Sequence, residues 1–266
     1  MTTMVAFDLD RTMIYSRRAR KLGTDEGPSV CVEIHDGKEA SFMTAAAAAG
    51  LVALAETTLA VPVTTRVADQ YRRVVLPGRP PRYSVTTNGG ALLVDGRADR
   101  GWTRRVEREL AGSFPLEAVW EQVGHICHPD FTVMLRNASG LFCYAVVRPS
   151  LLPTGFVDDV SGWAAERGWR TSLQGRKLYW VPERLTKGAA VAEVAEREGC
   201  ELVLAAGDSL LDVDLLLGAD RGIHPRHGEL HEQGWSGPNV VSTQSSGIAA
   251  GTEIVRWFAA QAAQAA

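Results

Sequence analysis

The sequence predicts an α/β protein with a parallel-sheet core and an inserted α+β module. Short apolar runs at Met4–Phe7, Leu59–Val63 and Leu202–Ala206 each lead into small polar or acidic residues. Helical patterns lie between these runs, and strands that alternate with helices are typical of a parallel sheet. From about residue 90 to residue 178, paired alternating strands lie beside helices instead, which indicates a separate α+β unit.

Composition bounds the class of protein. The chain has 266 residues, of which 45% are hydrophobic, enough for one large domain or a domain with an insertion. The formal net charge of −3 argues against a dedicated nucleic-acid binder. The cysteines stand far apart and form no metal-like pair, at Cys31, Cys127, Cys143 and Cys200. This spacing predicts reduced thiols in a cytoplasmic protein.

The sequence also predicts no role in a membrane. Asp8 and Asp10 interrupt the first apolar stretch, so no signal peptide is expected. The longest apolar run, Ala45–Ala55, is shorter than the roughly 20 residues that span a bilayer.

The first half of the core is expected to contain strands, a hairpin and helices in a fixed order. Thr44 is a suitable N-cap for the Ala-rich helix that follows it. The expected elements are a strand at 4–7, a hairpin over 29–42 with its turn at 35–38, a helix from 45 to 56, a strand at 59–63, a helix near 68–75 and a strand at 83–86.

The inserted module has its own pattern. Phe131–Arg136 and Leu141–Arg148 alternate as an antiparallel pair joined by a short polar turn. Around them the pattern predicts a strand at 91–94, helices at 102–111, 116–123 and 154–167, and further strand over 170–181. The core then resumes and ends in a helix over 251–263. The expected division is therefore a core of residues 1–89 and 179–266 and a module of residues 90–178.

The end of the first strand carries the most specific chemical signal. Asp8, Asp10 and Thr12 occupy alternate positions, which share a face in extended backbone. Carboxylates that converge repel one another unless a cation lies between them. Hard oxygen ligands favour magnesium over zinc. The pattern predicts a Mg²⁺ site with a carboxylate available as a nucleophile.

Two other strand ends should meet this one. Leu59–Val63 leads into Thr64-Thr65-Arg66, and Leu202–Ala206 leads into Gly207-Asp208-Ser209, with Asp212 four residues after Asp208. The carboxyl ends of parallel strands gather at one edge of the sheet, where open α/β folds bind ligands. Between these segments, Thr186-Lys187-Gly188 opens a helical pattern.

Together these residues resemble the motifs of the haloacid dehalogenase superfamily of phosphatases. The segments concerned are Asp8-Leu9-Asp10-Arg11-Thr12, Thr64-Thr65-Arg66, Lys187 and Gly207-Asp208-Ser209-Leu210-Leu211-Asp212. Thr87-Asn88-Gly89-Gly90 is similar to the Ser-Asn-Gly that precedes the cap in the Cof-type and sucrose-phosphate-phosphatase-like branch. Arg11 and Thr65 replace usual glycines, and Leu211 replaces a usual asparagine. The resemblance implies a Rossmann-like core with an inserted α+β cap.

The resemblance also implies roles for residues of the core. Asp8 would attack phosphorus and Asp10 would be the general acid and base. Thr64 would bind the transferring phosphoryl group, and Lys187 would balance negative charge. The expected metal ligands are Asp8, the Asp10 backbone carbonyl, Asp208 and Asp212. The expected substrate-binding residues are Thr65, Arg66 and Asn88, with Arg136 and Arg176 from the cap.

The function expected from the sequence is a magnesium-dependent phosphatase of small phosphorylated metabolites. A sugar phosphate is the expected substrate, by resemblance to the branch, and the chemistry would pass through an aspartyl-phosphate. A phosphomutase of the same superfamily remains an alternative, because it shares the acids and a similar cap. A non-catalytic ligand-binding relative is another. The expected partner is a small-molecule phosphate ester, with no nucleic acid and no membrane.

Overall fold

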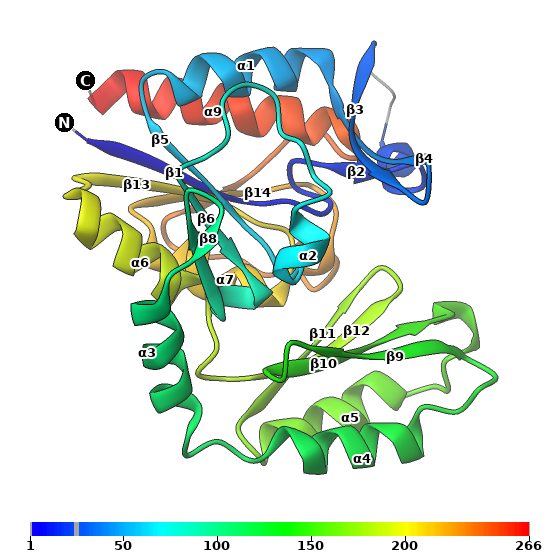
Figure 1. The fold of residues 1–266 in the computed structure, drawn as a ribbon. Coiled ribbons are helices and arrows are strands. Elements are labelled where there is room, and N and C mark those ends of the chain that lie inside the picture. Colours follow the sequence, from blue (N-terminus) through cyan, green and yellow to red (C-terminus); the bar gives the residue numbers. More distant parts are fainter. Residues whose placement is uncertain (1, 24–26, 266) are drawn as a thin grey trace. The chain divides into compact units, whose positions relative to one another are not determined.

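The computed structural model describes residues 2–23 and 27–265 (Figure 1). The chain forms two units. One comprises the residues up to Asp99 together with those from Thr186 on, and the other is Arg100–Leu185. The predicted fold class, an α/β core interrupted by an α+β insertion, is confirmed.

The first unit is built on a large sheet with the strand order β15-β14-β13-β1-β5-β6-β7-β8. Its strands are β1 (Thr3–Asp8), β5 (Leu59–Val63), β6 (Tyr83–Thr86), β7 (Ala91–Val94), β8 (Arg97–Ala98), β13 (Leu202–Ala206), β14 (Arg221–His224) and β15 (Val240–Ser242). The strands from β15 to β6 are parallel. β7, which the sequence pattern assigned to the inserted module, pairs antiparallel with β6 and extends this sheet.

β1 lies inside this sheet, between β13 and β5, and all its residues are buried. A strand covered on both faces reads as a continuous apolar run, which explains the Met4–Phe7 pattern. The helices of this unit are α1 (Ala45–Ala55), α2 (Ala68–Tyr71), α6 (Lys187–Glu198), α7 (Val213–Gly218), α8 (Glu229–Glu232) and α9 (Ile248–Ala265). α1 and α9 lie side by side on one face of the sheet, and α6 and α7 lie on the other (Figure 1). Short 3₁₀ turns complete the unit at Ala19–Leu22 (η1), Thr87–Gly89 (η2) and Leu210–Asp212 (η4).

Thr44 begins α1, as predicted. Its Oγ1 accepts a hydrogen bond from the Ala47 backbone N–H at 2.9 Å, which satisfies one of the donors left open at a helix start. The same hydroxyl lies 2.6 Å from Thr252 Oγ1 of α9. This contact joins the two helices that cover one face of the sheet.

The predicted hairpin is also present. β3 (Ser29–His35) and β4 (Lys38–Thr44) pair antiparallel, and β4 pairs in turn with the short β2 (Tyr15–Ser16). The register of β3 against β4 shifts on either side of Glu33. Glu33 is buried although it is charged and lies in β3, an edge strand of this sheet. Its partners belong to the candidate site.

The second unit carries a four-stranded sheet in the order β11-β12-β10-β9. Its elements are α3 (Arg100–Leu110), α4 (Leu116–Ile126), β9 (Thr132–Ala138), β10 (Phe142–Val147), η3 (Pro149–Leu151), α5 (Phe156–Ala165), β11 (Trp169–Gln174) and β12 (Lys177–Pro182). α4 and α5 cover one face of this sheet (Figure 1). The strands are antiparallel, as the alternating pattern predicts.

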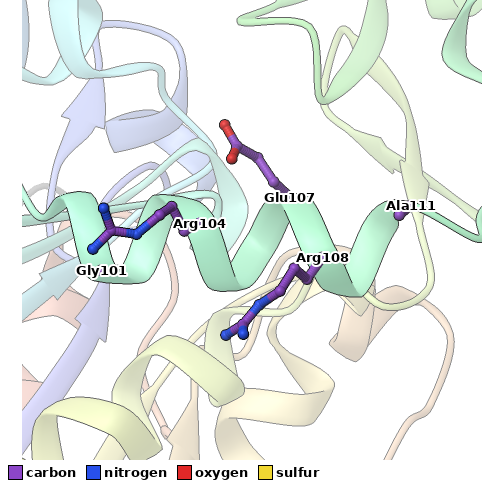
Figure 2. Close-up of a pocket in the computed structure, with 5 residues that line it drawn as sticks. All are labelled: Gly101, Arg104, Glu107, Arg108 and Ala111. Atoms are coloured by element: carbon purple, nitrogen blue, oxygen red, sulfur yellow. The ribbon is translucent and has the colours of Figure 1, made fainter.

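A pocket of about 650 Å³ lies along α3, lined by Gly101, Arg104, Glu107, Arg108 and Ala111. The side chains of Glu107 and Arg108 leave the helix in opposite directions (Figure 2). The charged groups of Glu107 and Arg108 therefore do not converge on a common point in this pocket. Across the residues that the structure describes, no helix has the length and apolar character needed to cross a membrane.

Candidate active site

The candidate site lies where neighbouring parallel strands end. β1 ends at Asp8, β5 is followed by Thr64, and β13 is followed by Gly207 and Asp208. Because β13, β1 and β5 are adjacent and parallel, their carboxyl ends meet at one edge of the sheet. Asp8, Thr64 and Asp208 are all buried there. The tertiary structure thus brings together residues that are about 200 positions apart in the chain.

Lys187 connects two acids of the cluster. It is the first residue of α6, and Thr186 caps that helix by accepting a hydrogen bond from the Ala189 N–H at 3.2 Å. The Lys187 Nζ lies 2.6 Å from Asp8 Oδ1 and 2.5 Å from Asp212 Oδ1. Burial by itself lowers the pKa of Lys187, but Asp212 and Asp8 outweigh it and raise that pKa above its usual value. Lys187 is therefore a permanent cation in the site.

Asp8 is held on both of its carboxylate oxygens. Thr12 Oγ1 donates to Asp8 Oδ2 at 3.2 Å, while Lys187 occupies Oδ1. Burial raises the pKa of the Asp8 carboxyl to about 7, and Asp212 and Asp10 push in the same direction while Lys187 opposes them. Burial, together with the neighbouring acids, thus disfavours the charged form of Asp8. An additional cation would favour that form.

Asp212 organises the loop that carries Asp208. Its Oδ2 accepts hydrogen bonds from the backbone N–H groups of Asp208 and Ser209, at 3.1 and 2.9 Å, and from Ser209 Oγ at 2.7 Å. Gly207 allows this arrangement, because a Cβ there would come within 2.3 Å of Asp212 Cβ. Both oxygens of Asp212 thus already have partners, Lys187 being the partner of the other.

The acidic cluster fits a divalent cation. Asp8, Asp208 and Asp212 each offer a carboxylate oxygen, and these oxygens lie within 4.8 Å of one another. Asp208 Oδ2 is buried and accepts no hydrogen bond within the described residues. Gly228 leaves room for it, since a Cβ at that position would lie 2.7 Å from this oxygen. An all-oxygen set of this kind suits a hard cation such as Mg²⁺.

Arg11 borders this cluster in place of the glycine typical of the motif. Its Nε lies 3.5 Å from Asp208 Oδ2, and its Nη2 lies 3.5 Å from Glu232 Oε1. Burial raises the pKa of Asp208 well above its usual value, and the Arg11 guanidinium opposes that rise. Arg11 has a φ of 68°, which is costly for a residue with a Cβ. Its backbone is therefore strained next to a group of buried acids.

His227 holds the strained backbone of Arg11 in place. The Gly247 N–H donates to His227 Nδ1 at 3.1 Å, so Nε2 carries the proton and donates to the Arg11 carbonyl at 2.8 Å. Burial lowers the pKa of His227 to about 4, so the ring is neutral near pH 7. His227 thus acts as a neutral support for the loop. The sequence shows only a histidine in a loop pattern, and gives no signal for this contact.

Thr64, Arg66 and Asn88 lie together in one buried turn region. The Arg66 N–H donates to Thr64 Oγ1 at 3.1 Å, which leaves the hydroxyl hydrogen of Thr64 for donation to a ligand. The Asn88 N–H donates to the Thr64 carbonyl at 3.0 Å. The Arg66 side chain forms a bidentate pair with Asp10, with Nε and Nη2 donating at 2.6 and 2.8 Å. Thr65 is buried beside them.

The other predicted substrate-binding residues belong to the second unit. Arg136 lies on β9 and Arg176 lies in the turn between β11 and β12. Both side chains are exposed. Glu33, on the hairpin of the first unit, was not among the sequence-based candidates, yet it forms an ion pair with Arg66 at 2.8 Å. Its run, Val30-Cys31-Val32-Glu33-Ile34, gives no sign that the charged member is buried.

Comparison with solved structures identifies the fold. The sucrose-phosphatase from Synechocystis sp. PCC6803, in complex with sucrose and phosphate, superposes with a TM-score of 0.63 at 16% identity, over 97% of this chain and 99% of that chain. A haloacid dehalogenase-like hydrolase from B. subtilis gives 0.61 at 10% identity, over 95% and 98%. The trehalose-6-phosphate phosphatase C-terminal domain from C. albicans gives 0.60 at 13%, over 97% and 92%.

These likenesses extend over nearly the whole chain and show that it has the fold of haloacid dehalogenase superfamily phosphatases. No family model matches the sequence, and no curated protein is significantly similar to it. The likeness to these solved structures therefore lies in the fold and not in the sequence.

Proposed function

We propose that this protein is a magnesium-dependent phosphatase of small phosphorylated metabolites, with sugar phosphates as its substrate class. The observation that carries the proposal is the buried cluster of Asp8, Asp208 and Asp212 at the end of β1, in which Lys187 pairs with Asp8 and with Asp212. Phosphoryl transfer depends mainly on positioning and on neutralisation of charge, which this cluster supplies. The sugar-phosphate phosphatases among the structures of the same fold support the substrate class.

In the proposed reaction, an Asp8 carboxylate oxygen attacks phosphorus and the bond from phosphorus to the ester oxygen breaks. The Asp10 carboxyl gives its proton to the departing oxygen, so the alcohol leaves neutral. Asp10 then takes a proton from the water that hydrolyses the aspartyl-phosphate, which releases inorganic phosphate and restores both acids. Thr64 and Lys187 hold the phosphoryl oxygens during both transfers.

Asp8 and Asp208 would hold Mg²⁺, with the Asp10 carbonyl, and with Asp212 either as a ligand or through water. The bound ion supplies charge neutralisation between the phosphoryl group and the attacking carboxylate. Removal of the metal with a chelator should therefore stop hydrolysis, and added Mg²⁺ should restore it. Ca²⁺ should support it poorly, because its larger and looser coordination misplaces an in-line attack. Full activity in chelator without added metal would contradict the proposal.

The direct test is release of free phosphate from a panel of phosphorylated metabolites with Mg²⁺ present. No bisphosphate is added, because a phosphomutase needs a phosphorylated activator and returns the phosphate to its substrate. We expect phosphate release from sugar phosphates by the wild type and none by Asp8→Asn, which keeps the size of the side chain. Circular dichroism of the variant should match the wild type. Substantial hydrolysis by folded Asp8→Asn would exclude the covalent route.

A further inference from the structure

The Asp10 carboxylate is held by Arg66, which is itself held by a buried acid. Arg66 contacts both Asp10 oxygens, through Nε and Nη2. A bidentate pair of this kind fixes the rotation of the carboxylate about its last bond. The Arg66 side chain is 8% exposed and that of Asp10 is 34% exposed. The arginine is therefore the buried anchor, and the aspartate is the accessible group that it orients.

Arg66 is in turn held by Glu33 of hairpin β3–β4. Arg66 Nη1 lies 2.8 Å from Glu33 Oε1. The guanidinium thus has a carboxylate on each side, and burial, which alone lowers the pKa of Arg66, is outweighed by Asp10 and Glu33. Without Glu33, one edge of a buried guanidinium would lose its counter-ion. A buried cation in that position shifts toward other acceptors or water.

Glu33 itself has a complete set of partners. Ser41 Oγ donates to Glu33 Oε2 at 2.6 Å across the hairpin, and Arg73 Nε donates to Oε1 at 3.3 Å. Burial alone raises the pKa of Glu33, but the nearby Arg66 guanidinium and the Ser41 hydroxyl lower it below its usual value. Glu33 is therefore ionised near pH 7 and provides a fixed negative charge.

We propose that Glu33 is a positioning residue for the reaction, which acts through Arg66 to aim the Asp10 carboxyl group at the leaving group. This inference rests on the proposed phosphatase function. It assigns the hairpin a part in proton transfer, because the hairpin carries both Glu33 and its partner Ser41. It also explains why a charged residue is buried at a bulged position of β3, where a shifted register turns the side chain toward Arg66.

A purely structural role for Glu33 would be to fasten the hairpin to the core, and the two roles predict different kinetics. Misplacement of the general acid matters most for an ester whose alcohol needs a proton to leave. It matters little for 2,4-dinitrophenyl phosphate, whose phenolate leaves without one. A loosened hairpin would instead lower the rate for both esters. The quantity to compare is kcat/KM, which reports the steps up to formation of the aspartyl-phosphate.

The experiment compares Glu33→Met, which fills the same space without an acceptor, with Glu33→Gln, which keeps one acceptor oxygen. Glu33→Met should lower kcat/KM for an alkyl phosphate by about ten- to a hundredfold more than for 2,4-dinitrophenyl phosphate. Glu33→Gln should fall between Glu33→Met and the wild type. Glu39→Met is the matched control, because Glu39 lies on the same hairpin but pairs with Arg17 at the surface. It should leave both values unchanged.

A double variant tests whether Glu33 acts through Asp10. In the Asp10→Asn background, Glu33→Met should cause little further loss, because the group it positions is already gone. If Glu33→Met lowered both esters equally, or if its effect were fully additive with Asp10→Asn, the positioning role would be wrong.

A crystal structure of Glu33→Met provides a readout that does not depend on turnover. We expect the Arg66–Asp10 bidentate pair to be broken or rotated, and an unchanged pair would overturn the inference. If Glu33→Met folds too poorly for kinetics, the crystal structure of Glu33→Gln provides the same comparison of the Arg66–Asp10 pair. If the wild type released phosphate from no ester, the proposed function itself would be refuted, together with the catalytic role of Glu33. If the wild type released phosphate, and Glu33→Met had the same ratio of kcat/KM for the two esters, only the positioning role would be refuted.

Discussion

At the scale of single residues, the site is a balance between buried acids and a few cations. Asp8, Asp208 and Asp212 are all buried, and Lys187 contacts two of them directly. Lys187 alone cannot neutralise three carboxylates, and burial, with the repulsion between the acids, raises the pKa values of Asp8 and Asp208. Arg11 supplies part of the missing charge from a strained backbone position.

Arg11 should therefore weaken the binding of a divalent cation at the acidic cluster. Its guanidinium lies near Asp208 and repels any cation held there. Arg11→Gly removes this charge and suits the positive φ, so the dissociation constant for Mg²⁺ should fall by about tenfold, about 1.4 kcal/mol. Isothermal titration calorimetry with both proteins in the same buffer measures it directly.

Arg17→Gly is the control for this measurement, because Arg17 forms an exposed pair with Glu39. Its removal should leave Mg²⁺ affinity unchanged, since solvent screens such a charge. Weaker Mg²⁺ binding by Arg11→Gly would show that the guanidinium supports the metal site, contrary to this prediction.

At the scale of elements, the position of Lys187 depends on how closely α6 approaches the turn η2. Gly89 of η2 has a φ of 92°, and a Cβ there would lie 2.0 Å from the Thr186 carbonyl oxygen. Thr186 caps α6 directly before Lys187. The glycine of the Thr87-Asn88-Gly89-Gly90 segment is thus required by a backbone contact that sets the start of the helix.

Gly89→Ala should both destabilise the protein and move Lys187 away from the acids, so that activity falls as well. The expected loss is about 2–4 kcal/mol in the free energy of unfolding, because the substitution adds a clash with backbone to the strain at positive φ. Urea denaturation measures the stability, and phosphate release measures the activity.

Gly96→Ala separates the effect of strain at positive φ from the effect of the clash with backbone. Gly96 has a φ of 74° but nothing within 4 Å of its Cβ position, so it carries the backbone strain without the clash. It should cost only about 1 kcal/mol and leave activity unchanged. Equal losses for the two variants would mean that the close approach of η2 and α6 contributes nothing.

At the scale of the whole molecule, chemistry and substrate choice are expected to be divided between the two units. Asp8, Thr64, Lys187 and Asp208 all belong to the first unit, while Arg136 and Arg176 belong to the second. All substrates of the proposed phosphatase would share the phosphoryl group, which we expect the first unit to bind. The leaving groups differ, so another surface has to distinguish them.

Substitution of Arg136 or Arg176 by alanine should therefore change the ranking of substrates in kcat/KM, by about 1–3 kcal/mol for a lost charged contact. Lys187→Ala should lower kcat/KM for all substrates together, because it acts on the group that they share. A small panel of phosphate esters, assayed with both kinds of variant, makes the comparison. Uniform losses from the arginine variants, or a reordered panel with Lys187→Ala, would contradict this division.

The sequence by itself determined the fold class, the order of the core elements and the strand ends that carry acidic and polar residues. Those features follow from local rules: an apolar run is a buried strand, a threonine caps a helix, and parallel strands share an edge. Asp8, Thr64 and Asp208 could be placed at one sheet edge on these grounds, and Lys187 was selected through the resemblance to the superfamily motifs. The Cof-like Thr87-Asn88-Gly89-Gly90 segment could be recognised, but the reason for its glycine could not.

Only the tertiary structure decided which charges meet. The pair between Arg66 and Asp10, the ion pair between Arg66 and Glu33, and the hydrogen bond from His227 to the Arg11 carbonyl join residues far apart in sequence. No periodicity or spacing encodes such pairs, because they depend on how the hairpin and loops pack onto the sheet edge. Burial then sets their strength, since a charge removed from water must be satisfied by whichever group the fold places beside it.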